Sequence, residues 1–166
     1  HEAHTLGLAT SATMMYGHVE QPRQRVDHLL AIRDLQARCP EGKPGFLAFI
    51  PWIFRSTGTR LEAEGISTDF SPLEYIRIIA ASRLILNNIP NIQASWLTVG
   101  RQTAQAALHS GANDMGSIMI EENVVSSAGA HNRFDAEGIR GAIREAGFTP
   151  RLRDQLYGMR EYAPQA

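Results

Sequence analysis

The sequence predicts an α/β fold in which parallel strands alternate with helices. Four short apolar segments, each of the length of a buried strand, are separated by segments whose apolar residues recur at helical spacing. Proline and glycine residues mark most of the breaks, and no short turn signal joins two strands into a hairpin. Strands that alternate with helices in this way form parallel βαβ units.

The first strand is expected over residues 8–16, and the helix after it extends to about Cys39. Prolines and glycines between residues 40 and 45 end this helix before the second strand, which is expected over residues 46–52. Residues 56–69 have the composition of a polar loop. The apolar stripe of the first helix is formed by Val26, Leu29, Leu30 and Leu35.

The next helix has the clearest start signal in the chain. Ser71 can act as its N-cap, Pro72 suits the first helical position and Glu74 completes a capping box. The third strand is expected over residues 91–96 and the fourth over residues 115–120.

A short alanine-rich helix is expected between these two strands, over residues 100–109. Asp135 is expected to cap a last helix that ends at Gly147. Residues 1–150 then form one domain of four βα units, and residues 151–166 form a polar tail.

Four βα units are half of a TIM-type (βα)₈ barrel, which has eight strands and typically about 250 residues. The main alternative, a doubly wound sheet, usually carries a G-x-G-x-x-G fingerprint after its first strand, and this sequence has none. Half a barrel leaves two sheet edges and its inner face uncovered. The predicted fold is therefore half of such a barrel, taken from a longer protein.

The composition excludes several classes of partner. The 166 residues carry a formal net charge of −1, so nothing indicates a nucleic-acid or anionic membrane surface, and no apolar run approaches a membrane span. The single cysteine, Cys39, fits a reducing, cytoplasmic compartment and cannot alone hold an iron–sulfur cluster, which usually takes three or four thiolates. His1 and His4 have no evident third ligand, so no metal site is expected within this chain.

Polar residues gather at the carboxyl ends of the expected strands, where barrels of this type place their reacting groups. Gly17 permits a tight turn, and Glu20 lies where a helix dipole favours a carboxylate, which is a sufficient local explanation for it. The aromatic residues of 46–55 could line a pocket or form core. The third strand has a polar face, which indicates a ligand or a water network because buried amides need partners; it consists of Asn91, Gln93 and Ser95.

Acidic residues flank the fourth expected strand. Asn113 and Asp114 precede it, and Glu121 and Glu122 follow it. Carboxylates at a strand end could orient hydroxyl groups or transfer a proton. A solvated loop explains them equally well.

Four long motifs, in order, resemble the radical S-adenosylmethionine (SAM) enzymes of the futalosine and deazaflavin pathways. They are residues 12–20 (ATMMYGHVE), 45–52 (GFLAFIPW), 91–100 (NIQASWLTVG) and 111–130 (GANDMGSIMIEENVVSSAGA). Within this group, the tryptophan of FIPW and the stretch SIMIEENVVSSAGA are most similar to the cyclases that act on dehypoxanthine futalosine. The sister aminofutalosine and deazaflavin synthases share the first motif but differ after the last strand.

The resemblance implies that this chain is the C-terminal half of the barrel of a menaquinone-pathway enzyme. The full enzyme would bind a [4Fe–4S] cluster through a Cys-x₃-Cys-x₂-Cys motif and cleave SAM to a 5′-deoxyadenosyl radical. That radical would take a hydrogen atom from the ribose of dehypoxanthine futalosine, and the resulting carbon radical would close a ring on the benzoate. The implied partners are this small molecule and an electron donor such as flavodoxin or ferredoxin.

The resemblance also assigns site residues. The pattern G-x-I-x-G-x-x-E, which packs against the SAM adenine, is matched by Thr13, Met15, Gly17 and Glu20, with Thr13 replacing the first glycine. Substrate contacts are implied for His18, Gln93, Ser95, Asn113 and Glu122, and proton transfer for Glu121 and Asp114. Because the cluster motif is absent, we expect the chain alone to be inactive. The alternatives are a sister radical SAM synthase and a non-catalytic half-barrel binding protein.

Overall fold

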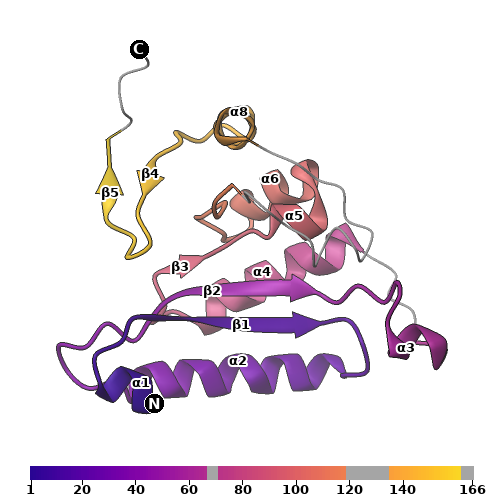
Figure 1. Ribbon diagram of the computed structural model, residues 1–166, viewed down its shortest axis with the longest axis horizontal. Coiled ribbons are helices and arrows are strands. Elements are labelled where there is room, and N and C mark those ends of the chain that lie inside the picture. The colour runs from indigo at the N-terminus through magenta and orange to yellow at the C-terminus, as the bar shows by residue number, and fades with distance from the viewer. Residues whose placement is uncertain (67–70, 119–134, 162–166) are drawn as a thin grey trace.

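The computed structural model describes residues 1–66, 71–118 and 135–161. Its centre is a parallel sheet in the order β1-β2-β3, made of β1 (Thr10–Tyr16), β2 (Phe46–Ile53) and β3 (Asn91–Ile92). Two long helices, α2 (Pro22–Ala37) and α4 (Pro72–Ile85), connect these strands (Figure 1). The predicted α/β class with parallel strands is confirmed. The arrangement fits part of a barrel but does not by itself establish one.

Shorter elements complete the fold. Four short helices have four to nine residues each, and the sequence predicted the last of them: α1 (Glu2–Thr5), α3 (Arg60–Ala63), α5 (Trp96–Val99) and α6 (Arg101–His109). The last helix is α8 (Ala136–Glu145), and it is followed by β4 (Leu152–Arg153) and β5 (Met159–Arg160). No helix within the described residues is long and apolar enough to cross a membrane.

The predicted helix starts at Ser71 and Asp135 are confirmed. The Ser71 hydroxyl accepts a hydrogen bond from the backbone N–H of Glu74 at 3.3 Å, and the Asp135 carboxylate accepts one from Gly138 at 2.7 Å. Each contact satisfies one of the N–H groups that a helix leaves unpaired at its first turn.

The third strand is shorter than predicted, because its last residues leave the ladder. Gln93 still donates to the carbonyl of Phe49 at 3.0 Å, but the N–H of Ser95 donates to the hydroxyl of Tyr75 on α4 at 2.7 Å. At Ser95 the backbone therefore bonds to a side chain and not to a neighbouring strand. Trp96 is the first residue of α5, although it was predicted to end the third strand.

The prediction of a fourth strand over residues 115–120 is not supported over residues 115–118, the part of this range that the structure describes. A single parallel bridge joins Gln93 to Asp114, and residues 115–118 form no strand. The Asp114 carboxylate accepts the N–H of Gly116 at 3.0 Å, and Gly116 has a φ of +71°, so the chain bends away from the extended conformation. Residues 119 and 120 lie outside the described part.

The C-terminal tail contains a hairpin that the sequence analysis did not predict. β4 and β5 pair antiparallel, and the Asp154 carboxylate accepts the N–H groups of Leu156 and Gly158, both at 2.9 Å. Asp residues commonly close turns in this way. Tyr157 adopts a left-handed φ of 65° at the bend. The tail therefore has a defined conformation up to residue 161.

The two faces of the sheet differ sharply in exposure. Along β1, Ala12, Met14 and Tyr16 are buried, whereas the alternating Ser11, Thr13 and Met15 are exposed. The buried face packs against α2 and α4, which contribute Leu29, Ile32, Tyr75 and Ile79 to the core. We call the opposite face, which carries Thr13 and Met15, the inner face of the sheet.

Strand register extends the inner face across the sheet. Thr13 pairs with Ile50, Met15 with Trp52, and Ser11 with Ala48, which in turn pairs with Asn91. Paired residues of parallel strands point to the same side of a sheet. Asn91 and Gln93 therefore lie on the inner face, and so does Asp114 through its bridge to Gln93.

The hydrogen bond between Ser95 and Tyr75 gives a test of this packing. Tyr75 is fully buried and Ser95 is 4% exposed, so Tyr75→Phe leaves a buried N–H without its acceptor. We expect Tyr75→Phe to lower the free energy of unfolding of the complete protein that contains this chain by about 1–3 kcal/mol, measured by urea unfolding.

Tyr16→Phe is the matched control for Tyr75→Phe. The Tyr16 hydroxyl is buried but has no hydrogen-bond partner among the described residues, so its removal is expected to change the stability by less than about 0.5 kcal/mol. Equal losses in the two variants would contradict the proposed role of the Tyr75 hydroxyl.

Candidate functional site

The loop after β1 is built around the carboxylate of Glu20. Its Oε1 accepts the N–H of Gly17 at 2.6 Å, and its Oε2 accepts the N–H of His18 at 3.0 Å. Gly17 has a φ of +90°, a left-handed conformation that favours glycine over residues with a Cβ. The chain therefore folds back on itself directly after the strand, and the carboxylate closes the turn.

Arg25 of α2 holds this carboxylate from the other side. Its Nε donates to Glu20 Oε1 at 2.6 Å, and its Nη1 donates to Glu74 in the first turn of α4. The guanidinium also lies over the ring of Tyr16, 4.9 Å from the centroid. The Arg25 side chain is only 11% exposed, so one buried cation connects the loop after β1 with two helices.

These contacts strongly favour the ionised form of the Glu20 carboxyl group. Burial opposes the ionised form, but the N–H groups of Gly17 and His18 and the guanidinium of Arg25 outweigh it and lower the pKa of Glu20 to about 2. The carboxylate is therefore ionised at any physiological pH and is unsuited to proton transfer.

His18 and Met15 are the residues of this region that remain open to a ligand. The N–H of Val19 donates to His18 Nδ1 at 2.8 Å, and the His18 ring lies edge-on to the Phe54 ring, with 5.5 Å between the ring centroids. Met15 is 57% exposed on the inner face and is paired with Trp52. A thioether beside an indole is a suitable surface for a flat ring.

Gln93 lies farther along the inner face, against Gly116. A methyl group at Gly116 would come within 2.8 Å of Gln93 Nε2, so the glycine leaves room for the amide. The polar inner face predicted for the third strand is supported for Asn91 and Gln93, although Asn91 donates to the carbonyl of Leu47 at 2.8 Å.

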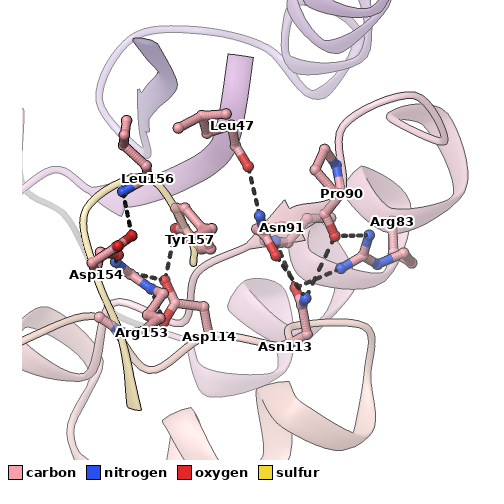
Figure 2. A network of polar contacts seen from close by, with 12 residues as sticks. Leu47, Arg83, Pro90, Asn91, Asn113, Asp114, Arg153, Asp154, Leu156 and Tyr157 are labelled. Atoms are coloured by element: carbon pink, nitrogen blue, oxygen red, sulfur yellow. Dashed lines mark hydrogen bonds and ion pairs between the residues drawn. The ribbon is translucent and has the colours of Figure 1, made fainter. Parts of the chain in front are cut away.

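Two residues predicted to contact the substrate, Ser95 and Asn113, make hydrogen bonds within the protein. The Ser95 hydroxyl is buried and donates to the carbonyl of Pro51 at 2.8 Å. The Asn113 side chain accepts from the N–H of Ile92 and from Arg83, both at 2.9 Å, and its amide donates to Asn91 at 3.0 Å (Figure 2). These side-chain contacts reinforce the edge of β3, where the backbone of Asn113 and Asp114 also pairs with Ile92 and Ala94.

The carboxylate of Asp114 anchors the C-terminal hairpin. Arg153 donates to it twice, from Nε at 3.1 Å and from Nη2 at 2.7 Å, and the Tyr157 hydroxyl donates at 2.8 Å (Figure 2). The guanidinium of Arg153 also stacks on the Tyr157 ring, 3.9 Å from its centroid. Burial and the neighbouring carboxylate raise the pKa of the Tyr157 phenol. With the N–H of Gly116, four donor groups of the chain bond to the Asp114 carboxylate, so the geometry favours a positioning role for it.

A cavity of about 490 Å³ lies beside this anchor, between α8, residues 113–118 and the hairpin. Its lining is mostly apolar and includes Ile118, Ile139, Ile143 and Phe148, with Asp114 and Arg153 at its polar side. None of the residues of the loop after β1 lines it. The structure therefore offers two separate regions, and Glu121 and Glu122, which follow the cavity lining along the chain, lie outside the described residues.

The side chains of the chain do not fit the cluster that the resemblance implies. Cys39 lies just after α2, in the segment that precedes β2. Its thiol donates to the carbonyl of Lys43 at 3.7 Å. Within residues 1–66, 71–118 and 135–161, no group of three or more His, Cys, Asp or Glu side chains is arranged to hold a metal ion. The exposed Met15 beside Trp52, by contrast, fits contact with an adenine ring.

Several residues of these networks were not predicted from the sequence. Arg25 stands five positions after Glu20, at a spacing that no helical rule connects to it, because Glu20 precedes the helix. Arg153 and Tyr157 belong to the unexpected hairpin. The turn residues Asp154 and Gly158, which flank Tyr157, were the available signal for that hairpin.

Parallel strands joined by helices, with polar groups on the uncovered face, define this chain as part of an α/β protein built from βα units. The chain belongs to the family described as the CofH/MqnC C-terminal region, whose model matches residues 43–166. The predicted resemblance to this group of enzymes is confirmed.

The similar proteins carry two different activities in their names. The cyclic dehypoxanthine futalosine synthase of Streptomyces coelicolor is 44% identical over 155 residues, which are 93% of this chain and 37% of that protein. The 5-amino-6-(D-ribitylamino)uracil--L-tyrosine 4-hydroxyphenyl transferase of Methanopyrus kandleri is 42% identical over 159 residues, 93% of this chain and 42% of that protein.

A second cyclic dehypoxanthine futalosine synthase, from Halalkalibacterium halodurans, is 40% identical over 152 residues, 92% of this chain and 39% of that protein. The chain thus spans less than half the length of each of these relatives.

Glu20→Gln is expected to destabilise the complete protein by on the order of 2 kcal/mol near pH 7, because the charged acceptor of Arg25 is lost. The folded-state pKa of Glu20 lies below its ordinary value of 4.5, so its contribution is fully present above pH 4.5 and is lost as the pH falls towards 2. The difference between variant and wild type in urea unfolding should therefore shrink over that range.

Glu64→Gln serves as the control for Glu20→Gln, because within the described residues Glu64 forms its ion pair with the exposed Arg60. Its effect is expected to stay within about 0.5 kcal/mol at every pH. A pH-independent loss for Glu20→Gln would contradict the assigned charge contacts.

Arg153→Gln is expected to release the C-terminal hairpin, since both hydrogen bonds to Asp114 and the stacking on Tyr157 are lost. Limited chymotrypsin digestion of the complete protein should then cut after Leu156 or Tyr157 roughly tenfold faster. Arg160→Gln, a change at an exposed residue of the same hairpin, should leave the rate unchanged. An unchanged rate in Arg153→Gln would rule out the anchoring role of Asp114.

Proposed function

We propose that this chain is part of a radical SAM enzyme that converts dehypoxanthine futalosine to its cyclic form in menaquinone biosynthesis. The observation that carries the proposal is the 44% identity to the Streptomyces coelicolor synthase over 93% of the chain. The motifs at residues 12–20 and 111–130 support the same choice. The chain would contribute the second half of the barrel, and the cluster ligands would lie in the remainder of the protein.

In this proposal the inner face of the sheet binds both SAM and dehypoxanthine futalosine. The cluster and SAM, when bound, supply the radical that takes a hydrogen atom from the substrate. Met15 and Trp52 provide an apolar surface for the adenine, and the loop from Gly17 to Glu20 limits the space around it. Thr13, exposed two residues before Met15, borders the same surface.

The substrate would lie beside these residues on the inner face. His18 and Gln93 are the polar groups proposed to orient it, and Glu122 is retained as a further contact. Glu121 is the proposed proton acceptor, because the carboxylate of Asp114 is occupied by Arg153 and Tyr157. Ser95 and Asn113 would act by holding the strand ends that carry these groups.

The second candidate is the transferase reaction of the sister enzymes, favoured by the 42% identity to the Methanopyrus kandleri protein. The reaction would also use radical SAM chemistry but would act on 5-amino-6-(D-ribitylamino)uracil and tyrosine, the two compounds in that protein's name. The two candidate reactions differ in their substrates, so the inner face would have to bind dehypoxanthine futalosine in one case and the uracil and tyrosine compounds in the other.

One experiment separates the two candidates. The complete protein, reconstituted anaerobically with iron and sulfide, is incubated with SAM, a reductant and either dehypoxanthine futalosine or the uracil–tyrosine pair. We expect the cyclic product from the first substrate and none from the second, with mass spectrometry as the measurement. Formation of the tyrosine adduct alone would refute the proposed cyclase. The 166-residue chain should give neither product, because it has one thiol.

A further inference from the structure

The largely buried guanidinium of Arg25 touches the loop after β1, the strand itself and a second helix. It donates to Glu20 in the loop, stacks on Tyr16 at the end of β1, and donates to Glu74 at the start of α4. A surface ion pair would join two of these elements at most. Arg25 therefore fixes the loop relative to the helix layer.

The Glu20 carboxylate is a central contact of the loop. It accepts the N–H groups of Gly17 and His18, its Oε2 lies 3.3 Å from Nδ1 of the His18 ring, and its Oε1 accepts the Nε–H of Arg25. The Glu20 side chain is 15% exposed, and Arg25 is the charged donor to its carboxylate. Without the guanidinium the carboxylate would keep neutral N–H donors alone, so the closed turn would be less stable.

The turn lies directly beside the surface proposed for the adenine. Gly17 and His18 follow Met15 by two and three residues, and the ring of His18 contacts Phe54 just after β2. A loop that opened by the length of one side chain would move His18 away from Met15 and Trp52. The ligand would then lose one side of its binding surface.

We propose that Arg25 is a positioning residue for the adenosine-binding loop, acting through Glu20, and that Glu74 in turn positions Arg25. This inference rests on the proposed function, since it takes SAM as the ligand of the loop. Helix α4 thereby transmits its position to the binding surface through a chain of two ion pairs, Glu74 to Arg25 and Arg25 to Glu20.

The test is SAM binding to the complete protein, measured anaerobically by calorimetry for four variants. We expect Arg25→Gln to raise the Kd for SAM roughly tenfold, Arg25→Lys to restore part of the loss because it keeps the charge, and Glu74→Gln to raise the Kd roughly two- to threefold. The control is Arg23→Gln, because the Arg23 side chain lies on the same helix but is 89% exposed, and the ion pair that the structure describes for it is with Asp27. It should bind SAM as the wild type does.

A second measurement separates loop positioning from general stability. Hydrogen exchange at Gly17 and His18 should accelerate in Arg25→Gln, while exchange in the core of α4, at Ile79, should not. If the exchange at Ile79 also accelerates, the arginine serves overall stability and the inference is wrong.

The outcomes distinguish this inference from the function on which it rests. Wild-type protein that binds SAM, with Arg25→Gln binding equally well, overturns the positioning role alone. Wild-type protein that binds no SAM overturns the proposed function. If Arg25→Gln does not fold, Glu74→Gln decides, because it keeps the Glu20 contact; an unchanged Kd in that variant overturns the link to α4.

Discussion

The covering of only one face of the sheet by helices is the constraint on which the rest of the structure depends. Parallel strands normally have both faces covered. Here α2 and α4 bury alternate residues of β1, such as Met14, and leave Thr13 and Met15 exposed. Polar and apolar residues are therefore sorted by the two-residue period of the strand, and groups that could contact a ligand are collected on the inner face.

Many polar residues near the strand ends serve the fold before they serve a ligand. The Asn113 side chain accepts the N–H of Ile92 at the edge of β3, and Asp114 holds the hairpin through Arg153. Buried polar groups need partners, and here side chains supply some of them. The acidic and amide residues of this edge therefore cannot be assigned to chemistry from their identity alone.

The sequence predicted the local elements well and the long-range contacts poorly. Helix caps at Ser71 and Asp135 depend on residues three positions apart, so the spacing along the chain was sufficient. The bond between Ser95 and Tyr75, which ends β3 early, joins residues 20 positions apart and follows only from packing. Glu20 was recognised by its motif, but Arg25 and Glu74 became part of the same network only through the arrangement of α2 and α4.

The exposed thioether of Met15 has a consequence for the chemistry of the protein in air. At 57% exposure its sulfur is accessible to peroxide and related oxidants, and methionine sulfoxide is polar and chiral where the thioether is apolar. Oxidation would place a strong dipole beside Trp52, in the centre of the apolar surface. Peroxide would thus alter the apolar surface of this chain independently of any effect on an iron–sulfur cluster.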